Sequence, residues 1–525
     1  MSSLELSLRF RTIRYLKPVQ VFAKIWLKLN RIYLNCFVRK SKLPSGFRIP
    51  ILGQLNQLQK KITRYTIFDD IINLSDIDWK MNDKTNLFQY HLHYHEFLLF
   101  LDKNTGIKVI RDWIAKNSPS NSVSWDPYTI SIRVVNWIKF ISHHNIHDSV
   151  ILNSLYLQGI WLFHQREYNL LSNHFFKNII ALLYLGYIFR KNSWSKWASH
   201  NFKNQIREQL TENGYHFEFS PTYHAIFIKD LLDAYNLITN NETLTSKKFG
   251  IKLKNIIEKS LFWLQYFSAN EVYFPINDVN YQETPIPQEL LSYAKSLNIL
   301  SFETKEKQSD YYPILTKGDL TIVLYCAPFN PSYNPSHSHA DILSVLLWFK
   351  NKSIVIDTGC FTYDEGSERN YSRSTKAHNT IEIDGSDQCE LWKAFRIGRR
   401  GLLFDKKITD DRIDCSYSFQ EKIKVAHRRS VLKESDGFLI RDLLKGKGTH
   451  RYKMYFHLSP ECKIELKKKD LLIDHMIKIS FPNEEIKLIN SEYYPRIYQK
   501  HEKSTVEISG SFSDEKILET IIIKL

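Results

Sequence analysis

Residues from about 55 to 300 form a series of segments in which apolar positions recur at helical spacing. The clearest cover 152–163, 175–189 and 226–237, where apolar side chains return every three or four residues. Polar, turn-forming stretches such as 192–195 separate them. This number of paired amphipathic helices indicates a helical toroid or solenoid, although the sequence has no clean internal repeat.

The pattern changes after about residue 271, where four prolines interrupt the chain up to Pro313. Beyond them, short runs rich in β-branched and aromatic residues alternate with turn signals, which predicts antiparallel strands stacked as a β-sandwich. The predicted strands cover 320–325, 344–349, 354–356, 380–383, 438–443, 453–457, 471–479 and 520–524. Helices first and strands second predict an α+β chain of separate domains.

We therefore expect three parts. Residues 1–55 form a basic amphipathic segment, residues 56–300 form the helical domain, and residues 312–525 form the antiparallel β-sandwich domain. At 525 residues the chain is long enough for two large cores.

The charge of the chain narrows the class of partner. Its 72 Lys and Arg residues outnumber 56 Asp and Glu residues, which gives a formal net charge of +16. This favours a polyanion: an acidic polysaccharide, a nucleic acid or an anionic membrane surface. The basic residues are scattered and no zinc finger, helix-turn-helix or RNA-binding signature is present, so we expect no nucleic-acid partner. The 14% aromatic content fits stacking on sugar rings and packing in a large helical core equally well.

The six cysteines have no CxxC pair and no regular spacing, so we expect them to be reduced. No apolar run is long enough to span a membrane. The basic, amphipathic stretch 11–30 is broken by Lys24 and Lys28, which makes it a poor secretory signal. It could lie on an anionic membrane, but packing against its own domain is the favoured interpretation. We expect a cytoplasmic protein, or one with at most peripheral contact to the inner membrane.

Chemically active side chains are most concentrated between residues 337 and 378. His337, His339 and Asp341 alternate along the chain, so on a strand they would share one face. Asp357 and His378 follow. Imidazole and carboxylate groups are zinc ligands, and His is also the usual acid–base residue near neutral pH. Any one of the five could merely cap a turn, but together they favour a functional site.

Longer motifs surround these residues in both halves of the chain. The β-rich half contains HSHAD at 337–341, IVIDTG at 354–359 and RSTKAHNTIEIDG at 373–385. The helical half contains YHLHY at 90–94, WDPY at 125–128, SNH at 172–174 and HFEFSPTYH at 216–224. In this order, from about residue 80 to about 460, they resemble the heparinase II/III family of polysaccharide lyases.

The resemblance implies an (α/α) toroid of helical hairpins followed by a β-sandwich. It also implies an enzyme that cleaves an acidic, uronate-containing polysaccharide by β-elimination, and we expect a place in exopolysaccharide or capsule metabolism. The periplasm or cell envelope is the location that the family suggests as an alternative. The oligomeric state is left open.

Three residues match the catalytic positions of the family: Asn173, Tyr223 and His337. The Asn173 amide would neutralise the substrate carboxylate, and the phenol and imidazole would divide the roles of base and acid. The resemblance and the residue types imply a further set that binds substrate: Tyr90, His93, Tyr128, Arg133, His174, Glu218, His224 and Arg373. A salt bridge within the β domain is an equally good interpretation of Arg373, and core packing is the favoured role of Trp137.

His339, Asp357 and His378 match the metal positions of the family, which implies a divalent ion, zinc above all, in a structural or organising role. A metal-free hydrogen-bonded cluster is the alternative. Asp341 would orient His337 or His339. No organic cofactor is expected.

Three other functions were weighed. A glycoside hydrolase would need two carboxylates beside the scissile bond, for which Glu218 and Asp341 are available. A non-catalytic glycan-binding or assembly protein would not need Asn173, Tyr223 and His337 together. A zinc hydrolase is disfavoured because the HExxH motif is missing.

Overall fold

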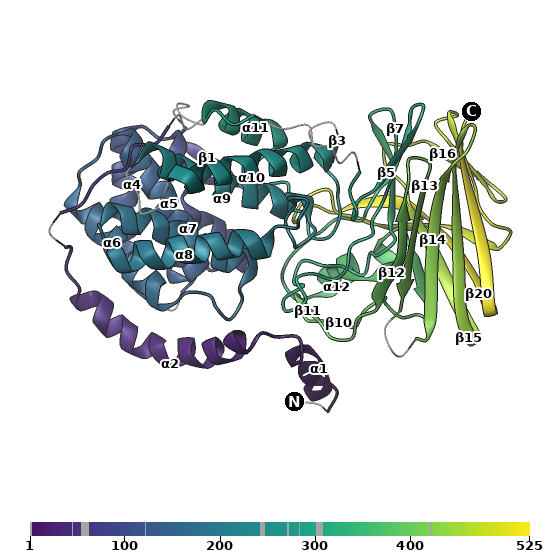
Figure 1. Ribbon diagram of the computed structural model, residues 1–525, viewed down its shortest axis with the longest axis horizontal. Coiled ribbons are helices and arrows are strands. Elements are labelled where there is room, and N and C mark those ends of the chain that lie inside the picture. Colours follow the sequence, from purple (N-terminus) through teal and green to yellow (C-terminus); the bar gives the residue numbers. More distant parts are fainter. Residues whose placement is uncertain are drawn as a thin grey trace.

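The computed structural model describes residues 3–44, 46–53, 62–120, 122–241, 247–269, 272–282, 284–300, 308–419 and 423–525. The N-terminal half is helical and the C-terminal half consists of antiparallel strands, as expected (Figure 1). The predicted boundary between residues 55 and 56 lies outside the described residues.

The α-helices are α1 (Ser3–Ile13), α2 (Pro18–Lys40), α3 (Asn86–Tyr94), α4 (Lys103–Lys116), α5 (Pro127–His143), α6 (Ser149–His164), α7 (Ser172–Ile188), α8 (Asn192–Gln209), α9 (Pro221–Asn240), α10 (Lys247–Tyr266), α11 (Pro287–Ser296) and α12 (Ser367–Arg373). Short 3-10 helices cover Glu96–Phe100, Val123–Trp125 and Thr375–Ala377.

Local sequence signals start the helices that lead into the site. Asp126 caps α5 by accepting a hydrogen bond from the backbone N–H of Tyr128 at 3.0 Å, and Pro127 takes the first helical position. Ser220 and Pro221 begin α9 in the same way. Both caps place an aromatic residue, Tyr128 or Tyr223, in the first turn of its helix.

The helical domain is built from packed neighbours, with α7 against α5 and α8, and α9 against α10. Its core contains the fully buried indoles of Trp113, Trp137 and Trp161, so part of the aromatic surplus serves packing. The three predicted helical segments lie within α6, α7 and α9. Two short hairpins lie in the region expected to be helical: β1 (Arg64–Ile67) with β2 (Asp70–Asn73), and β3 (Ser268–Ala269) with β4 (Val272–Tyr273).

The strands of the C-terminal half form two main antiparallel sheets. A four-stranded sheet has the order β5-β6-β7-β8, and a ten-stranded sheet runs β12-β13-β14-β15-β20-β18-β17-β16, with β9 on β15 and β19 on β20. The strands are β5 (Ile314–Lys317), β6 (Leu320–Leu324), β7 (Val345–Phe349), β8 (Lys352–Val355), β9 (Ile381–Ile383), β12 (Leu402–Ile408), β13 (Arg412–Ser418), β14 (Val425–Lys433), β15 (Gly437–His457), β16 (Ile464–Lys467), β17 (Asp470–Ile473), β18 (Ile477–Ser480), β19 (Glu485–Tyr493) and β20 (His501–Lys524). Two-stranded hairpins join β3 (Ser268–Ala269) to β4 (Val272–Tyr273) and β10 (Leu391–Trp392) to β11 (Arg396–Ile397).

Both main sheets contribute to one hydrophobic core, which also takes in Trp263 and Phe267 from the end of the helical half. Two sequence-based expectations needed correction. The predicted strands at 438–443 and 453–457 are one continuous strand of 21 residues, β15, and the predicted strand at 471–479 is divided into β17 and β18. The division falls at Asp474 and His475, whose positive φ angles of 50° and 56° turn the chain back.

The N-terminal segment forms two helices that lie along the lower edge of both domains (Figure 1). We call α1 and α2 together the strap. On the β side, Trp392 Nε1 donates to Thr12 Oγ1 at 3.0 Å. On the helical side, Asn30 Nδ2 donates to the carbonyl of His164 at 3.2 Å, and Leu34 and Val38 of α2 are buried in the helical core. Among the described residues, no helix combines the length and the apolar character that crossing a bilayer requires.

Gly106 in α4 provides a test of the helical packing. A Cβ atom at this position would lie 2.1 Å from the Cζ atom of Phe140, a buried ring of α5. Alanine is favoured over glycine in a helix by about 0.5–1 kcal/mol, but overpacking a core costs about 1–3 kcal/mol. We therefore expect Gly106→Ala to lower the free energy of unfolding, measured by chemical denaturation.

The matched control is Gly250→Ala in α10, where the nearest atom to an added Cβ is Thr239 Cγ2 at 4.0 Å. This change should be neutral or stabilise the protein by up to about 1 kcal/mol. A stabilising Gly106→Ala would show that α4 does not pack against Phe140 as described.

Candidate active site

A groove of about 530 Å³ lies between the helical and β domains. Its helical wall comes from α3 and from the first turns of α5, α7 and α9, and its β wall comes from loops and from the tip of the β10–β11 hairpin. The residues that line it include Tyr90, Tyr94, Tyr128, Asn173, His174, Tyr223, Asn334, Ser336, His337, Tyr363, Asp364, Glu365, Lys393, Phe395 and Arg396. The three predicted catalytic residues therefore meet in one groove.

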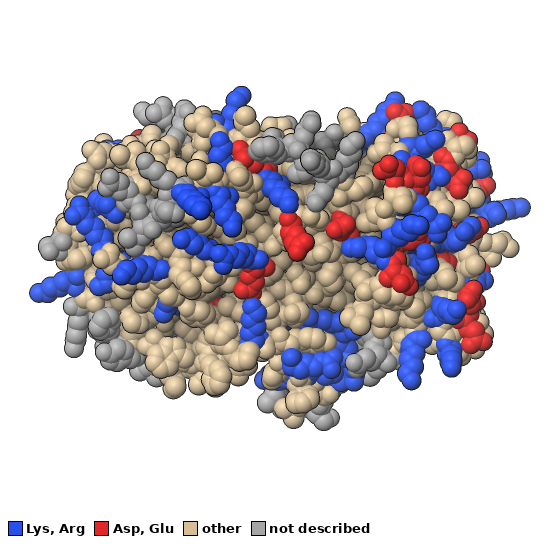
Figure 2. All heavy atoms as spheres, in the orientation of Figure 1, with Lys and Arg blue, Asp and Glu red and all other residues tan. Residues whose placement is uncertain are grey.

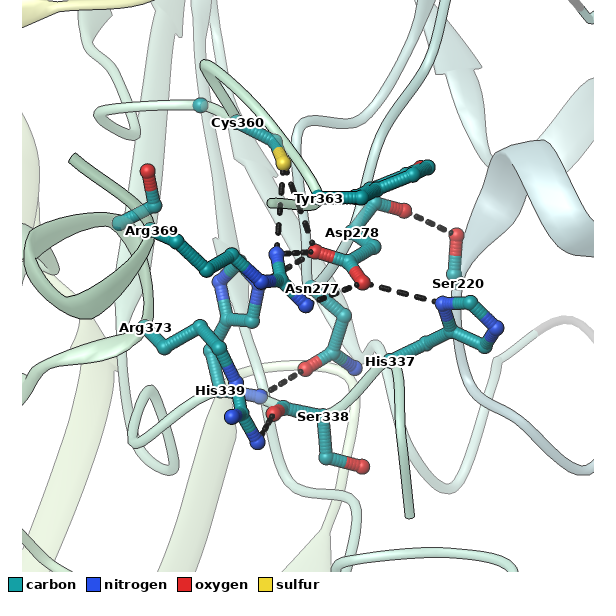
Figure 3. Close-up of polar contacts among 12 residues, drawn as sticks. Ser220, Asn277, Asp278, His337, Ser338, His339, Cys360, Tyr363, Arg369 and Arg373 are labelled. Atoms are coloured by element: carbon teal, nitrogen blue, oxygen red, sulfur yellow. Dashed lines mark hydrogen bonds and ion pairs between the residues drawn. The ribbon is translucent and has the colours of Figure 1, made fainter. Parts of the chain in front are cut away.

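The carboxylate of Asp278 lies directly behind the groove and joins three segments that are distant in the sequence (Figure 3). One oxygen lies 3.0 Å from His337 Nδ1 and the other lies 2.8 Å from His339 Nε2. Arg369 of α12 donates to both oxygens, at 2.8 Å from Nη2 and over a shorter contact from Nη1. All four residues are buried.

The charges of this cluster are set by these contacts. Burial by itself would raise the pKa of Asp278, but the Arg369 guanidinium and the bonds from His337 and His339 outweigh it and hold that pKa well below its ordinary value. Asp278 is therefore ionised near neutral pH, and its charge is compensated inside the protein.

Asp278 also fixes the protonation pattern of His337. Because an ionised carboxylate only accepts, Nδ1 of His337 carries the proton that it donates. The Asn173 amide nitrogen only donates, so Nε2 accepts from it through its lone pair. Nε2 faces the groove and lies 3.3 Å from Nδ2 of Asn173. The ring of Tyr223 covers the imidazole, with the two ring centroids 3.8 Å apart.

Tyr223 lies in the first turn of α9, where contacts of its ring hold it in place. Its hydroxyl donates to the hydroxyl of Tyr363 across the groove at 3.5 Å. Burial is the main reason why the pKa of Tyr223 is raised well above its ordinary value, and Tyr363 and Asp278 add to the effect. The phenol is therefore protonated at neutral pH.

Asn173 lies in the first turn of α7, where its amide is oriented from behind. Nδ2 donates to both carboxylate oxygens of Glu218 at 3.1 Å, and its second N–H is directed to the side of His337. The chain reaches this position through Leu171 and Ser172, whose φ angles of 59° and 52° are unusual for residues with a side chain. Strained backbone of this kind gathers at functional sites.

Three of the predicted substrate-binding residues line the groove: Tyr90, Tyr128 and His174. The ring of His174 lies 4.3 Å from that of Tyr128, centroid to centroid, and its Nδ1 lies 2.8 Å from Glu167 Oε1. Burial alone would lower the pKa of His174, but Glu167 outweighs it and raises that pKa. The His174 imidazole and the Tyr128 ring together offer a basic group and a stacking surface to a ligand.

The prediction that His93 and Arg133 line the groove is corrected by the structure. Both side chains are buried in the helical core, where His93 Nδ1 accepts from Trp113 Nε1 at 3.0 Å. Burial and the charge of Arg133 lower the pKa of His93 to about 3. Arg133 lies over the ring of Trp113 at 4.0 Å and donates to Gln158 at 2.9 Å, so its role is in the core.

Glu218, His224 and Arg373 are also removed from the groove. Glu218 is buried behind Asn173, and His224 accepts from the backbone N–H of His216 while its Nε2 lies 2.9 Å from the carbonyl of Ser260. Arg373 is 1% exposed and donates to the backbone carbonyls of Ser338, Lys393 and Ala394. None of these three side chains lines the groove. Within the described part of the chain, Arg373 forms no salt bridge, and its guanidinium donates to backbone carbonyls.

The three predicted metal ligands lie in one buried cluster beside Asp278. His378 Nδ1 lies 2.7 Å from Asp357 Oδ2, and the rings of His339 and His378 are 5.3 Å apart. His339 Nδ1, His378 Nε2 and Asp341 Oδ1 are buried without a hydrogen-bond partner, as atoms that bind an ion would be. The described residues nevertheless include no group of three or more donors arranged to hold an ion, so the metal stays a prediction.

Sequence patterns missed Asp278, Arg369 and Tyr363. Asp278 follows Asn277 in the proline-interrupted region near the end of the expected helical domain. The available signal was an adjacent Asn-Asp pair among apolar residues, because a carboxylate in such a stretch requires partners once it is buried. Arg369 lies four residues before Arg373, one helical turn away.

The chain is a two-domain protein, with a helical domain followed by an antiparallel β domain. A polar site lies in the groove between the two domains. Residues 54–298 match the family model of the heparinase II/III N-terminus, and residues 307–519 match that of the heparinase II/III-like C-terminal domain. Together the two matches cover most of the chain. The chain belongs to the heparinase II/III family.

Individual relatives agree with this assignment. The heparin-sulfate lyase of Pedobacter heparinus is 22% identical over 440 residues, which are 74% of this chain and 64% of that protein. The chain therefore spans less than two thirds of that relative. A crystal structure of heparinase III has a TM-score of 0.68 at 14% identity and covers 97% of this chain and 92% of its own. The heparan sulfate lyase HepC of Pedobacter heparinus has a TM-score of 0.55 at 16% identity and covers 95% and 88%. At these identities the structures show a shared fold.

Replacing Asp278 tests the ion pair behind the groove. Asp278→Asn leaves the Arg369 guanidinium buried without its counter-charge, and breaking a buried pair in this way costs about 3–5 kcal/mol. We expect a large fall in Tm. The double variant Asp278→Asn/Arg369→Met removes both charges and should recover part of the loss.

The control is Asp364→Asn, on the rim of the same groove, which should change the stability by no more than about 0.5 kcal/mol. A double variant that is no more stable than the single one would contradict the ion pair as the source of the loss. Thermal unfolding followed by circular dichroism measures all three.

Proposed function

We propose that this protein is a polysaccharide lyase that cleaves an acidic, uronate-containing polysaccharide by β-elimination. The observation that carries the proposal is the meeting of the Asn173 amide, the His337 imidazole and the Tyr223 phenol in one groove, with Asp278 fixing the tautomer of His337. Membership of the heparinase II/III family and the lyase names of the relatives support the same reaction.

The reaction begins with the proton on the carbon beside the substrate carboxylate. His337 is suited to accept it, because Nε2 is unprotonated and faces the groove while Nδ1–H is held by Asp278. The Asp278 carboxylate then stabilises the His337 imidazolium that forms, as in other Asp–His pairs. A positioned base of this type contributes about 10²–10⁴-fold to the rate.

The leaving sugar oxygen needs a proton in the same step. Tyr223 can supply it, because its raised pKa keeps the phenol protonated and its hydroxyl points across the groove to Tyr363. We therefore assign His337 as base and Tyr223 as acid. The two ring centroids lie 3.8 Å apart at an interplanar angle of 30°, so both groups can reach one bound sugar.

The substrate carboxylate must be neutralised while negative charge develops next to it. Asn173 donates without adding a competing base, and Glu218 holds its amide in place. The N–H on the side of His337 is the one that a bound carboxylate would accept. The positive end of α7 contributes in the same direction, because Asn173 lies in its first turn. His174, Lys393 and Arg396 give the groove further basic groups for an anionic chain.

The glycoside hydrolase alternative has less support. Glu218 and Asp341, the two carboxylates considered for it, are both buried behind the groove wall. Asp364 and Glu365 do line the groove but are neighbours on one loop, which does not place them on opposite sides of a bond. A purely glycan-binding role would not require Asn173, Tyr223 and His337 to meet in the groove.

The two antiparallel sheets, with their shared core, support a sandwich arrangement of the β domain. The exopolysaccharide or capsule context stays a prediction.

The activity test is ultraviolet absorbance during incubation with a panel of uronate polysaccharides, which detects the unsaturated uronate that elimination forms. We expect Tyr223→Phe and His337→Ala each to lower turnover by about 10²–10⁴-fold, and Asn173→Ala by about 10²–10³-fold, with unchanged folding. His450→Ala, on β15 and outside the groove, is the control and should keep full activity. New reducing ends without the absorbance would indicate hydrolysis and overturn the proposal.

We also propose a zinc ion held by His339, Asp357 and His378. Imidazole and carboxylate donors fit zinc, and when bound the ion would brace the β wall of the groove. The support is the buried, unpartnered nitrogen of each histidine.

Elemental analysis of the purified protein should find about one zinc ion per chain. His378→Ala should lose the ion and lower Tm together. The control His427→Ala removes another buried histidine, one paired with Asp442, and should keep the ion. Equal metal content in His378→Ala and wild type would refute the ligand assignment.

A further inference from the structure

The strap exposes an apolar face that its own fold does not use. Phe22, Trp26 and Leu29 of α2 recur every three or four residues, so they form one face of the helix, and they are 73%, 64% and 67% exposed. Helix α2 packs on the protein through a different face, which carries Leu34 and Val38. An amphipathic surface helix normally has one apolar stripe and buries it against the protein. Helix α2 has a second apolar stripe, and this one is exposed.

The exposed face continues along the strap. Ile25 extends it on α2, and Leu6, Phe10 and Ile13 of α1 are each more than half exposed. Single exposed apolar residues are ordinary on a protein surface, but seven on two successive helices indicate an interaction surface.

Basic residues accompany this face. Residues 1–42 contain ten Lys and Arg and one acidic residue. Lys24 and Lys28 are exposed on α2 itself, and Figure 2 shows Lys and Arg side chains gathered at the lower edge, near α1 and the β10–β11 hairpin. The partner must therefore combine an apolar phase with negative charge.

We propose that the strap docks on the surface of an anionic lipid bilayer. The apolar stripe would enter the boundary between headgroups and acyl chains, while the lysines bind anionic headgroups. A second copy of this chain would bring two strongly basic surfaces together, and an acidic polysaccharide would use the charges but not the exposed aliphatic side chains Ile13, Ile25 and Leu29. The inference does not depend on the proposed lyase activity.

The place of the strap on the molecule agrees with docking. Both helices lie along one edge of the protein, below both domains, so one plane can contact both (Figure 1). The strap is fastened by the Arg11–Glu390 ion pair at 2.8 Å and by the contact of Lys17 with Glu208. Glu390 directly precedes the β10–β11 hairpin, and this hairpin presents Lys393 and Arg396 to the groove. Docking of the strap would therefore hold the groove close to the membrane.

Co-sedimentation of the full chain with lipid vesicles tests this. The vesicles are phosphatidylcholine alone or phosphatidylcholine mixed with phosphatidylglycerol. We expect binding to the anionic vesicles to be at least about tenfold tighter than to the neutral ones, because each lysine near the surface adds attraction. Phe22→Ser/Trp26→Ser and, separately, Lys24→Gln/Lys28→Gln should each weaken it by about tenfold or more.

The matched control is Ile251→Ser, which removes an apolar side chain that is 68% exposed on α10, outside the strap, and should bind like wild type. Wild type that stays in the supernatant with anionic vesicles would overturn the proposal, as would binding that is unchanged in Phe22→Ser/Trp26→Ser. Sedimentation velocity without lipid tests whether a second copy of the chain occupies the face instead. A wild-type dimer that becomes a monomer in Phe22→Ser/Trp26→Ser would show that it does, and would overturn the proposal. Uronate cleavage should be equal in all variants, so failure here is distinct from failure of the lyase proposal.

Discussion

Burying a carboxylate without a partner is among the most unfavourable events in folding, and Asp278 is buried completely. Its charge can remain only because Arg369 and two histidines converge on it from other segments. The residue thus joins the region between the domains, the loop that carries His337 and His339, and α12. The same contacts that make the burial tolerable set the tautomer of His337. Structure and chemistry therefore depend on one ion pair network.

The site also shows a division between residues that touch the groove and residues that shape it. Glu218 orients the amide of Asn173, and Arg373 ties the carbonyls of the β10–β11 hairpin to that of Ser338. The backbone at Leu171 and Ser172 adopts positive φ angles that the fold has to hold in place. Substitution of such residues would change the geometry of the groove without removing any group that lines it, so their effects and those of the groove residues need separate measurements.

The order of helices and then antiparallel strands could be predicted from periodicity alone, and the motifs around Asn173, Tyr223 and His337 located the residues that meet in the groove. The sequence did not show which polar side chains would be buried and which would line the groove. His93 lies three residues after Tyr90 in the same helix, but it faces Trp113 in the core while Tyr90 faces the groove. Arg133 and Arg373 look like anion-binding groups in sequence and are used internally. Asp278 was missed because its partners are 59 or more residues away, so no local pattern records them.

That long-range assembly has a consequence for biosynthesis. When the ribosome has released only the helical half, the nascent chain already contains Asn173 and Tyr223, but it lacks His337 and the Arg369 that compensates Asp278. Asp278 then has to remain hydrated, and the edge of the helical domain stays open until the β strands arrive. The groove therefore cannot be complete at an intermediate stage of synthesis. Its two walls meet only in a chain whose halves have both folded and docked.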